Sequence, residues 1–256
     1  MIRQHILQIK NEHGKTFQPK WGYQFYGVLT KALGADNEFG DKLHSQEISP
    51  ISQYVRPLPT DNGSGEWTIS LMGQSAVENM EKRVDAIAEM HLFKQNLNVT
   101  VEDRTVTTIF TVQALIRQAL SEYHSDRFTI LFHTPTSFKT LGEYALFPTV
   151  PLIVNSLVSK WNAVWKTSVI ADNDAIEELI RGIRISTYKL QSSYYQIKEI
   201  RIPGFVGMIS LDAKLPDPLM EIWKPLISFG EYCGIGIKCA LGMGGISVYD
   251  TALPLA

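Results

Sequence analysis

Two features of the sequence could take part in chemistry: a glycine-rich segment in its last part and a set of six histidines. The segment from Gly234 to Gly245 holds five of the 18 glycines of the chain. Glycine lets another molecule approach the backbone closely and permits positive φ, so a loop of this kind can present N–H groups to phosphate oxygens. The alternative is a tight turn packed against a neighbouring strand. Without other evidence for a binding loop, a glycine-rich pattern favours this turn.

Neither common nucleotide-binding motif fits this segment. A Walker loop needs a Gly-Lys pair followed by serine or threonine, and no such pair occurs near it. A dinucleotide-binding fingerprint would have glycine where Cys239 stands, and would follow a strand and open a helix. Here the order of helix and strand is reversed.

His44 is the histidine with no obvious structural role. It lies in a polar loop after the first expected helix, and loops carry functional residues more often than cores do. An imidazole titrates near neutral pH, so it can give or accept a proton. The patterns assign the other histidines to strands (His5, His133), helix ends (His91, His124) and a turn (His13).

Other catalytic motifs are absent from the sequence. It contains no Gly-x-Ser-x-Gly, His-Glu-x-x-His or Cys-x-x-Cys pattern. Cys233 and Cys239 have no histidine nearby to complete a zinc site, and the acidic residues between 172 and 178 suit a helix start. We therefore predict no metal site and no cofactor.

Hydrophobic periodicity predicts an α+β fold. In the first half we expect strands over 2–10, 51–58, 66–71 and 97–109, and helices over 21–33 and 75–90. The resulting order, β-α-β-β-α-β, is that of a ferredoxin-like domain.

The second half is less decisive by pattern alone. A helix over 111–123 would join the halves, a strand over 128–133 follows, and 134–147 reads as a hairpin or an extended loop. Further helices are expected over 150–165, 175–184 and 218–232, and strands over 186–200, 205–211 and 246–249. Pro203-Gly204 is expected to separate two of these strands.

Composition sets further limits. A hydrophobic fraction of 45% over 256 residues is ordinary for a globular protein, with no membrane-length apolar run and no signal peptide, so we expect a cytoplasmic protein without a membrane partner. The net charge of −2 argues against a uniformly basic nucleic-acid-binding surface. Basic residues are instead concentrated in the first twenty residues and between 181 and 201, which predicts one basic face.

Several motifs, in order along the chain, resemble one family. They are Leu43-His44 with Ser49-Pro50, Thr134-Pro-Thr-Ser-Phe-Lys139, Ile202-Pro-Gly-Phe, Ser228-Phe-Gly-Glu-Tyr-Cys-Gly, and Gly-Ile-Gly followed after five residues by Gly-Met-Gly. Together they resemble the CRISPR-associated repeat-RNA endoribonucleases, the Cas six family, and most closely its members found with type III systems.

The resemblance implies a fold and a function. The fold would be two ferredoxin-like (RRM-like, RAMP) domains in tandem, residues 1–110 with the catalytic histidine and residues 111–256 with the glycine-rich loop. The activity would be metal-independent cleavage of CRISPR precursor RNA within its repeats by 2′-OH attack, giving 2′,3′-cyclic phosphate and 5′-OH ends. A homodimer and transient contact with a CRISPR effector complex are further expectations. A non-catalytic RNA-binding subunit of such a complex is the alternative, and a small-molecule-binding ferredoxin-like regulator would explain the strands but not the motifs.

The resemblance also assigns residues. His44 would be catalytic, with Tyr26 of the first helix as its partner. The family's lysine shortly after the histidine is missing, which leaves Tyr26, Lys31, Lys42 and Tyr54 open as the second proton-transfer group. RNA would be held by Lys139, Arg201, Gly234, Gly236, Lys238, Gly242, Gly244 and Gly245. Tyr194 or Tyr195 could stack on a base, and strand alternation predicts that one of the two faces inward.

Overall fold

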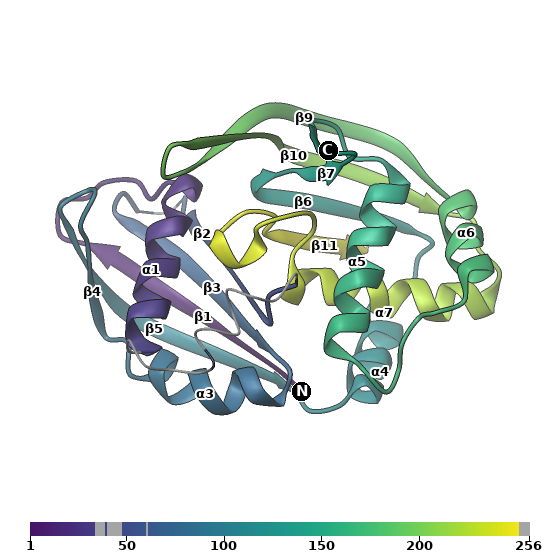
Figure 1. Cartoon of the computed structure of the whole chain (residues 1–256), viewed down its shortest axis with the longest axis horizontal. Coiled ribbons are helices and arrows are strands. Elements are labelled where there is room, and N and C mark those ends of the chain that lie inside the picture. Colours follow the sequence, from purple (N-terminus) through teal and green to yellow (C-terminus); the bar gives the residue numbers. More distant parts are fainter. Residues whose placement is uncertain (34–38, 40–47, 60, 251–256) are drawn as a thin grey trace.

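Two antiparallel sheets lie side by side, with helices on one face of each (Figure 1). The computed structural model describes residues 1–33, 39, 48–59 and 61–250. Within this part of the chain, none of the helices is long and apolar enough to cross a membrane.

The first sheet has the strand order β2-β3-β1-β5-β4. Its strands are β1 (Ile2–Asn11), β2 (Ile51–Pro57), β3 (Ser64–Met72), β4 (Glu89–Leu92) and β5 (Leu97–Ile109). One face is covered by α1 (Gly22–Leu33), which follows the 3₁₀ turn η1 (Pro19–Trp21), and by α3 (Gln74–Asp85). Alternate residues of β1, such as Leu7 and Ile9, are buried beneath these helices, as the period of two predicts.

The expected helix over 75–90 is wrong at its C-terminal end. Helix α3 stops at Asp85, and Met90 and His91 belong to β4 instead of a helix end. Arg104 of β5 accounts for this ending, because its guanidinium donates to the carbonyl oxygens of Val84 at 2.6 Å and Ile87 at 2.8 Å. Carbonyls at a helix end lack their usual i+4 donors, and Val84 O also accepts from Ile87 N at 3.2 Å.

The second sheet has the order β11-β6-β10-β9, the same relative order as β5-β1-β3-β2 in the first. Its strands are β6 (Arg127–Thr136), β9 (Ile183–Ile197), β10 (Ile200–Ala213) and β11 (Ile246–Asp250). It carries helices α5 (Val150–Val164), α6 (Asn173–Gly182) and α7 (Asp217–Cys233), and the hairpin of β7 (Phe138–Thr140) and β8 (Glu143–Ala145). Each half therefore has the ferredoxin-like topology, which the pattern alone had reached only for the first.

The predicted turn at Pro203-Gly204 is wrong. Both residues lie inside β10, and the turn between β9 and β10 falls at Lys198, which has a φ of +50°. Strand β10 tolerates a proline there because its pairing with β6 begins only at Phe205, so at Pro203 the strand pairs with β9 alone. The β9–β10 ribbon therefore extends beyond the sheet toward α1 (Figure 1).

The two halves meet around the glycine-rich loop. Helix α4 (Val112–Glu122) connects them and buries Leu115 and Ala119 in the core of the second half. From the first half, the Gln53 side chain donates to Ala240 O at 3.0 Å and to Gly22 O at 2.9 Å. A buried side chain of β2 thus fixes the loop relative to α1.

Candidate functional site

A cavity of about 1010 Å³ opens between the two halves. It is bordered by α1, by residues 48–51, by the β7–β8 hairpin, by α5, by the β9–β10 turn region and by the glycine-rich loop. Segments from the whole length of the chain thus converge on one hollow. A concave site of this size that gathers polar groups is the default location for a ligand.

In the described part of the chain, the charged side chains that line the cavity are all basic. Among the described residues these are Lys139 on β7, Lys160 on α5 and Lys238 in the loop, and no aspartate or glutamate lines it. The chain as a whole carries a formal charge of −2. The cavity is therefore positive in a protein that is slightly acidic, and it suits an anionic ligand.

The glycine-rich loop is held mostly by its own amides. Gly236 N donates to Ser156 Oγ at 2.9 Å, Ile237 N to Ser137 O at 3.0 Å and Gly245 N to Thr134 Oγ1 at 2.9 Å. Between Gly234 and Gly245, the amides of residues 238–240 are those without a hydrogen-bond partner in the described chain. Lys238 has left-handed backbone angles, φ +58° and ψ +29°. Of the array of N–H groups expected from the sequence, these three remain open to a ligand.

The glycines themselves are required by close packing. A Cβ on Gly236 would stand 2.3 Å from Ser137 O, and one on Gly244 would stand 2.1 Å from Ile235 O. Both residues also have positive φ, as do Gly234 and Gly242. A Cβ on Gly245 would meet the ring of Tyr54 at 2.3 Å. Of the five glycines, Gly236 lines the cavity. Direct RNA contact by the five glycines stays a prediction.

Tyr26 is the described candidate for proton transfer that lines the cavity. Burial, and secondarily Tyr23, raise the pKa of its phenol above the usual value. His44 and Lys42 lie outside the described residues, but Ile48 and Ser49, which follow His44 closely in the sequence, line the same cavity.

The other described candidates for proton transfer lie elsewhere. Lys31 Nζ sits 5.8 Å from the centroid of the Phe93 ring. Tyr54 is buried against His133, with ring centroids 5.7 Å apart, and burial raises its pKa to about 12. Neither of them lines the cavity.

The β9–β10 ribbon separates the two neighbouring tyrosines as predicted. Tyr195 is fully buried and donates to Leu241 O at 2.5 Å, which ties the ribbon to the loop. Tyr194 is exposed and lies beneath the Arg201 guanidinium, 3.7 Å from ring centroid to Cζ. Arg201 is exposed as well, between two residues that line the cavity, Ile200 and Ile202.

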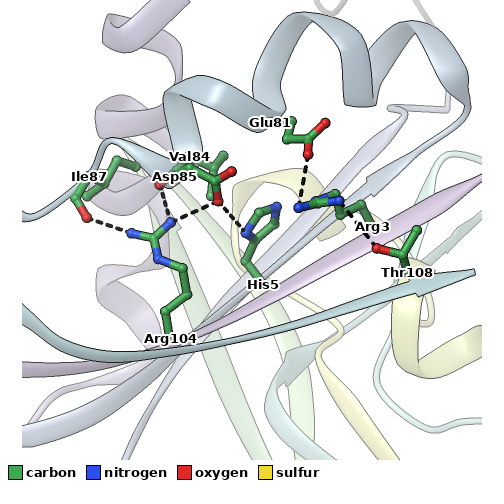
Figure 2. A network of polar contacts seen from close by, with 8 residues as sticks. All are labelled: Arg3, His5, Glu81, Val84, Asp85, Ile87, Arg104 and Thr108. Atoms are coloured by element: carbon green, nitrogen blue, oxygen red, sulfur yellow. Dashed lines mark hydrogen bonds and ion pairs between the residues drawn. The ribbon is translucent and has the colours of Figure 1, made fainter.

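A buried histidine network lies away from the cavity (Figure 2). His5 is fully buried beneath α3, with Nδ1 3.4 Å from Asp85 Oδ1. Burial lowers its pKa to about 4, although Asp85 acts in the opposite direction. The pKa of His133 is likewise lowered to about 4 by burial. Both are structural residues, as their strand positions predicted. In the described part of the chain, no three histidine, cysteine or acidic residues form a group that could hold a metal ion.

Sequence reasoning missed the contribution of α5. Asn155, Ser156, Ser159 and Lys160 all line the cavity from one face of this helix. Their spacing of one turn on an otherwise apolar helix was the available signal, because polar residues at i, i+1, i+4 and i+5 share one face.

Comparisons with known proteins agree with this geometry. The model of the CRISPR-associated endoribonuclease Cas6 family matches residues 130–246. A Cas6 endoribonuclease of Streptococcus thermophilus is 29% identical over 227 residues, 89% of this chain and 90% of that protein. One from Mycobacterium tuberculosis is 29% identical over 233 residues, 90% of this chain and 72% of that protein. A solved Cas6 product complex has a TM-score of 0.76 at 19% identity, covering 97% of this chain and all of that one, which supports the fold. In sequence over most of its length, and in fold, the chain is similar to CRISPR-associated Cas6 endoribonucleases.

Proposed function

We propose that this protein cuts CRISPR precursor RNA within its repeats and releases guide RNAs, without a metal ion. The observation that carries the proposal is the cavity between the two halves, which is lined by three lysines and, among the described residues, by no carboxylate. RNA brings one negative charge per phosphate, and a positive hollow attracts it.

The proposed reaction needs only proton transfers and charge stabilisation. His44 removes the proton of a 2′-hydroxyl, and the oxygen attacks the adjacent phosphorus as the bond to the 5′-oxygen breaks. An acid protonates the departing oxygen, which leaves a 2′,3′-cyclic phosphate and a 5′-hydroxyl. The raised pKa of Tyr26 keeps its phenol protonated at neutral pH. Tyr26 therefore suits the role of proton or hydrogen-bond donor better than that of base.

The negative charge that develops on the phosphorus needs fixed donors. Lys139 and Lys238 and the open amides of residues 238–240 supply them along one side of the cavity. Donors held in place before the reaction are worth more than mobile ones, because they need no reorganisation. In this proposal the packing of the glycines serves the reaction indirectly, by fixing the loop that carries these groups.

Several finer points belong to the same proposal. The division into domains at residues 110 and 111 is supported by α4, whose buried side chains join the core of the second half. Cytoplasmic location, association with type III systems, transient contact with an effector complex and a homodimer remain predictions from the resemblance.

The test is cleavage of the repeat RNA of the host by the purified protein in excess EDTA, with analysis of the product ends. Replacing the 2′-OH at the cut site by hydrogen should abolish cutting. His44→Ala should retain binding but slow cleavage by roughly 10²–10⁴-fold, the usual worth of a positioned proton transfer. Cutting of the 2′-deoxy substrate, or cutting restored only by Mg²⁺, would contradict the mechanism. Full activity of His44→Ala would move the catalyst to another residue.

A further inference from the structure

Lys160 is a half-buried cation of the cavity that has hydrogen-bond partners but no carboxylate partner in the described chain. Its ammonium is half-buried and donates to Gly234 O at 2.8 Å and to Cys239 Sγ at 3.1 Å. An ammonium has three N–H donors, so these two acceptors leave one unused. Both acceptors are uncharged groups, and no carboxylate of the described chain lies within ion-pair distance of Lys160.

This arrangement is unusual for a structural lysine. Withdrawing an ammonium from water costs free energy that a carbonyl and a thiol repay only in part, so partly buried cations normally have an anionic partner. A neutral donor such as glutamine could hold the same carbonyl at a lower desolvation cost. The positive charge is therefore useful mainly when an anion enters the cavity.

The surroundings of Lys160 define where that anion would lie. Its two contacts hold the loop on either side of Gly236, and Ser156, one turn earlier on α5, accepts the amide of Gly236 at 2.9 Å. The open amides of residues 238–240 begin at the same turn, and Lys160 lines the cavity with Lys139 and Lys238. A phosphate oxygen in the cavity would then have an ammonium, backbone amides and no opposing carboxylate among the described residues.

We infer that Lys160 binds a phosphate of the RNA in the cavity with its free N–H while it holds the glycine-rich loop in place. The inference rests on the proposed function, because it takes RNA as the ligand of the cavity. It adds a contact on α5 that none of the residues matched to the family's motifs provides.

Four variants separate the charge of Lys160 from its role in the loop. K160Q keeps a donor for Gly234 O but removes the charge, and K160R keeps the charge. S156A loosens the same loop without any change of charge. K166Q makes the same charge change just beyond α5, at an exposed lysine that does not line the cavity. Binding of the repeat RNA is measured over a range of salt concentrations, together with thermal unfolding and cleavage.

We expect K160Q to bind about 10–100-fold more weakly, with a salt slope lower by about 0.7–0.9, the share of one phosphate contact. K160R and K166Q should keep the salt slope of the unmodified protein. S156A should weaken RNA binding but leave the salt slope unchanged. An unchanged slope in K160Q would overturn the inference. If the unmodified protein binds the repeat RNA but does not cut it, the proposed activity is wrong. The salt slope of K160Q still shows whether Lys160 contacts a phosphate.

A second measurement covers the case in which K160Q does not fold. Cys239 is 8% exposed and Cys233 1%, so iodoacetamide should react mainly at Cys239 in the folded protein. Pyrophosphate bound at Lys160 should slow this reaction in the unmodified protein relative to chloride at equal ionic strength. Absence of protection would overturn the inference as well.

Discussion

Two charged regions of this molecule, the surroundings of His5 and the cavity, differ in how their cations are paired. Around His5, each arginine faces a carboxylate: Arg3 Nη2 lies 2.9 Å from Glu81 Oε1, and Arg104 Nη1 lies 3.3 Å from Asp85 Oδ1 (Figure 2). In the cavity, the three lysines face no carboxylate of the described chain.

The difference separates cations that hold the fold from cations that await a ligand. A paired cation is neutralised within the protein and contributes to stability, whereas an unpaired one repels its neighbours until an anion arrives. The formal charge of −2 therefore says little about RNA binding, because it averages over both regions. Changes in the first region should alter stability alone, and changes of Lys139 and Lys238, for whose side chains no loop-holding bond is found in the described chain, should alter binding alone.

The largest effect on stability should come from neither set of charges but from the wall of the cavity. Gly236→Ala places a Cβ 2.3 Å from Ser137 O at a φ of +84°. The clash and the backbone strain together should lower the free energy of unfolding by about 2–5 kcal/mol, measured by urea denaturation. Gly27→Ala is the control, since nothing lies within 4 Å of a Cβ there and alanine suits a helix. Equal stability of the two variants would show that the loop is not fixed by packing.

The next effect depends on pH and belongs to the paired region. The native pKa of His5 is about 4, against 6.5 for an exposed histidine, so the unfolded chain takes up a proton between these values and the folded protein does not. Stability should fall by about 2–3 kcal/mol from this group as the pH drops from 7 to 4.5, with little further loss below pH 4.

His5→Leu should make the pH dependence of unfolding shallower by that amount. His133, whose pKa is also about 4, would continue to contribute. The control is His124→Leu, because His124 is exposed. If the two leucine variants show the same pH dependence as the unmodified protein, His5 is not held neutral in the fold.

A smaller loss should follow from removing one paired arginine. Arg104→Met removes the only donor found in the described chain for the carbonyl of Ile87 and one of the donors to that of Val84, and should cost about 2 kcal/mol of stability, with RNA affinity unchanged. Arg127→Met is the matched control: its pair with Asp212 is more exposed and should be worth less than about 1 kcal/mol. A loss of RNA affinity in Arg104→Met would break the distinction between the two regions.

The sequence predicted elements well where short-range pattern decides the structure. The strand β1, the helix α1 and the inward position of Tyr195 follow from periodicities of two and 3.6. The end of α3 did not follow, because it depends on Arg104, which lies about twenty residues later and approaches only when the sheet has formed. The turn at Lys198 was missed for a similar reason: Pro203 is tolerated because β6 ends early, which no local pattern reveals.

The motifs named several residues that line the cavity, but not the residues that α5 contributes to it. The resemblance named Lys139, Lys238 and Tyr26, and the fold brings all three to one cavity. It gave no reason to examine Lys160, because the value of that residue lies in the absence of a carboxylate around it among the residues that the structure describes. Such an absence is a property of tertiary packing and cannot be derived from the residues next to Lys160 in the chain.

The smallest expected effects come from the loss of single phosphate contacts. They test whether the unpaired cations in and beside the cavity bind RNA. Lys139→Met and Arg201→Met should each weaken RNA binding and lower its salt slope by about 0.7–0.9, with no change in thermal stability. Lys139 has no carboxylate partner in the described chain and lines the cavity, whereas Arg201 lies on Tyr194 beside it. Lys94→Met is the control, since this exposed lysine does not line the cavity. If Arg201→Met leaves the salt slope unchanged and Lys139→Met lowers it, the RNA contacts the cavity but not Arg201 beside it. Unchanged slopes for both would contradict the assignment of unpaired cations to RNA, because Lys139 is the plainest example of one.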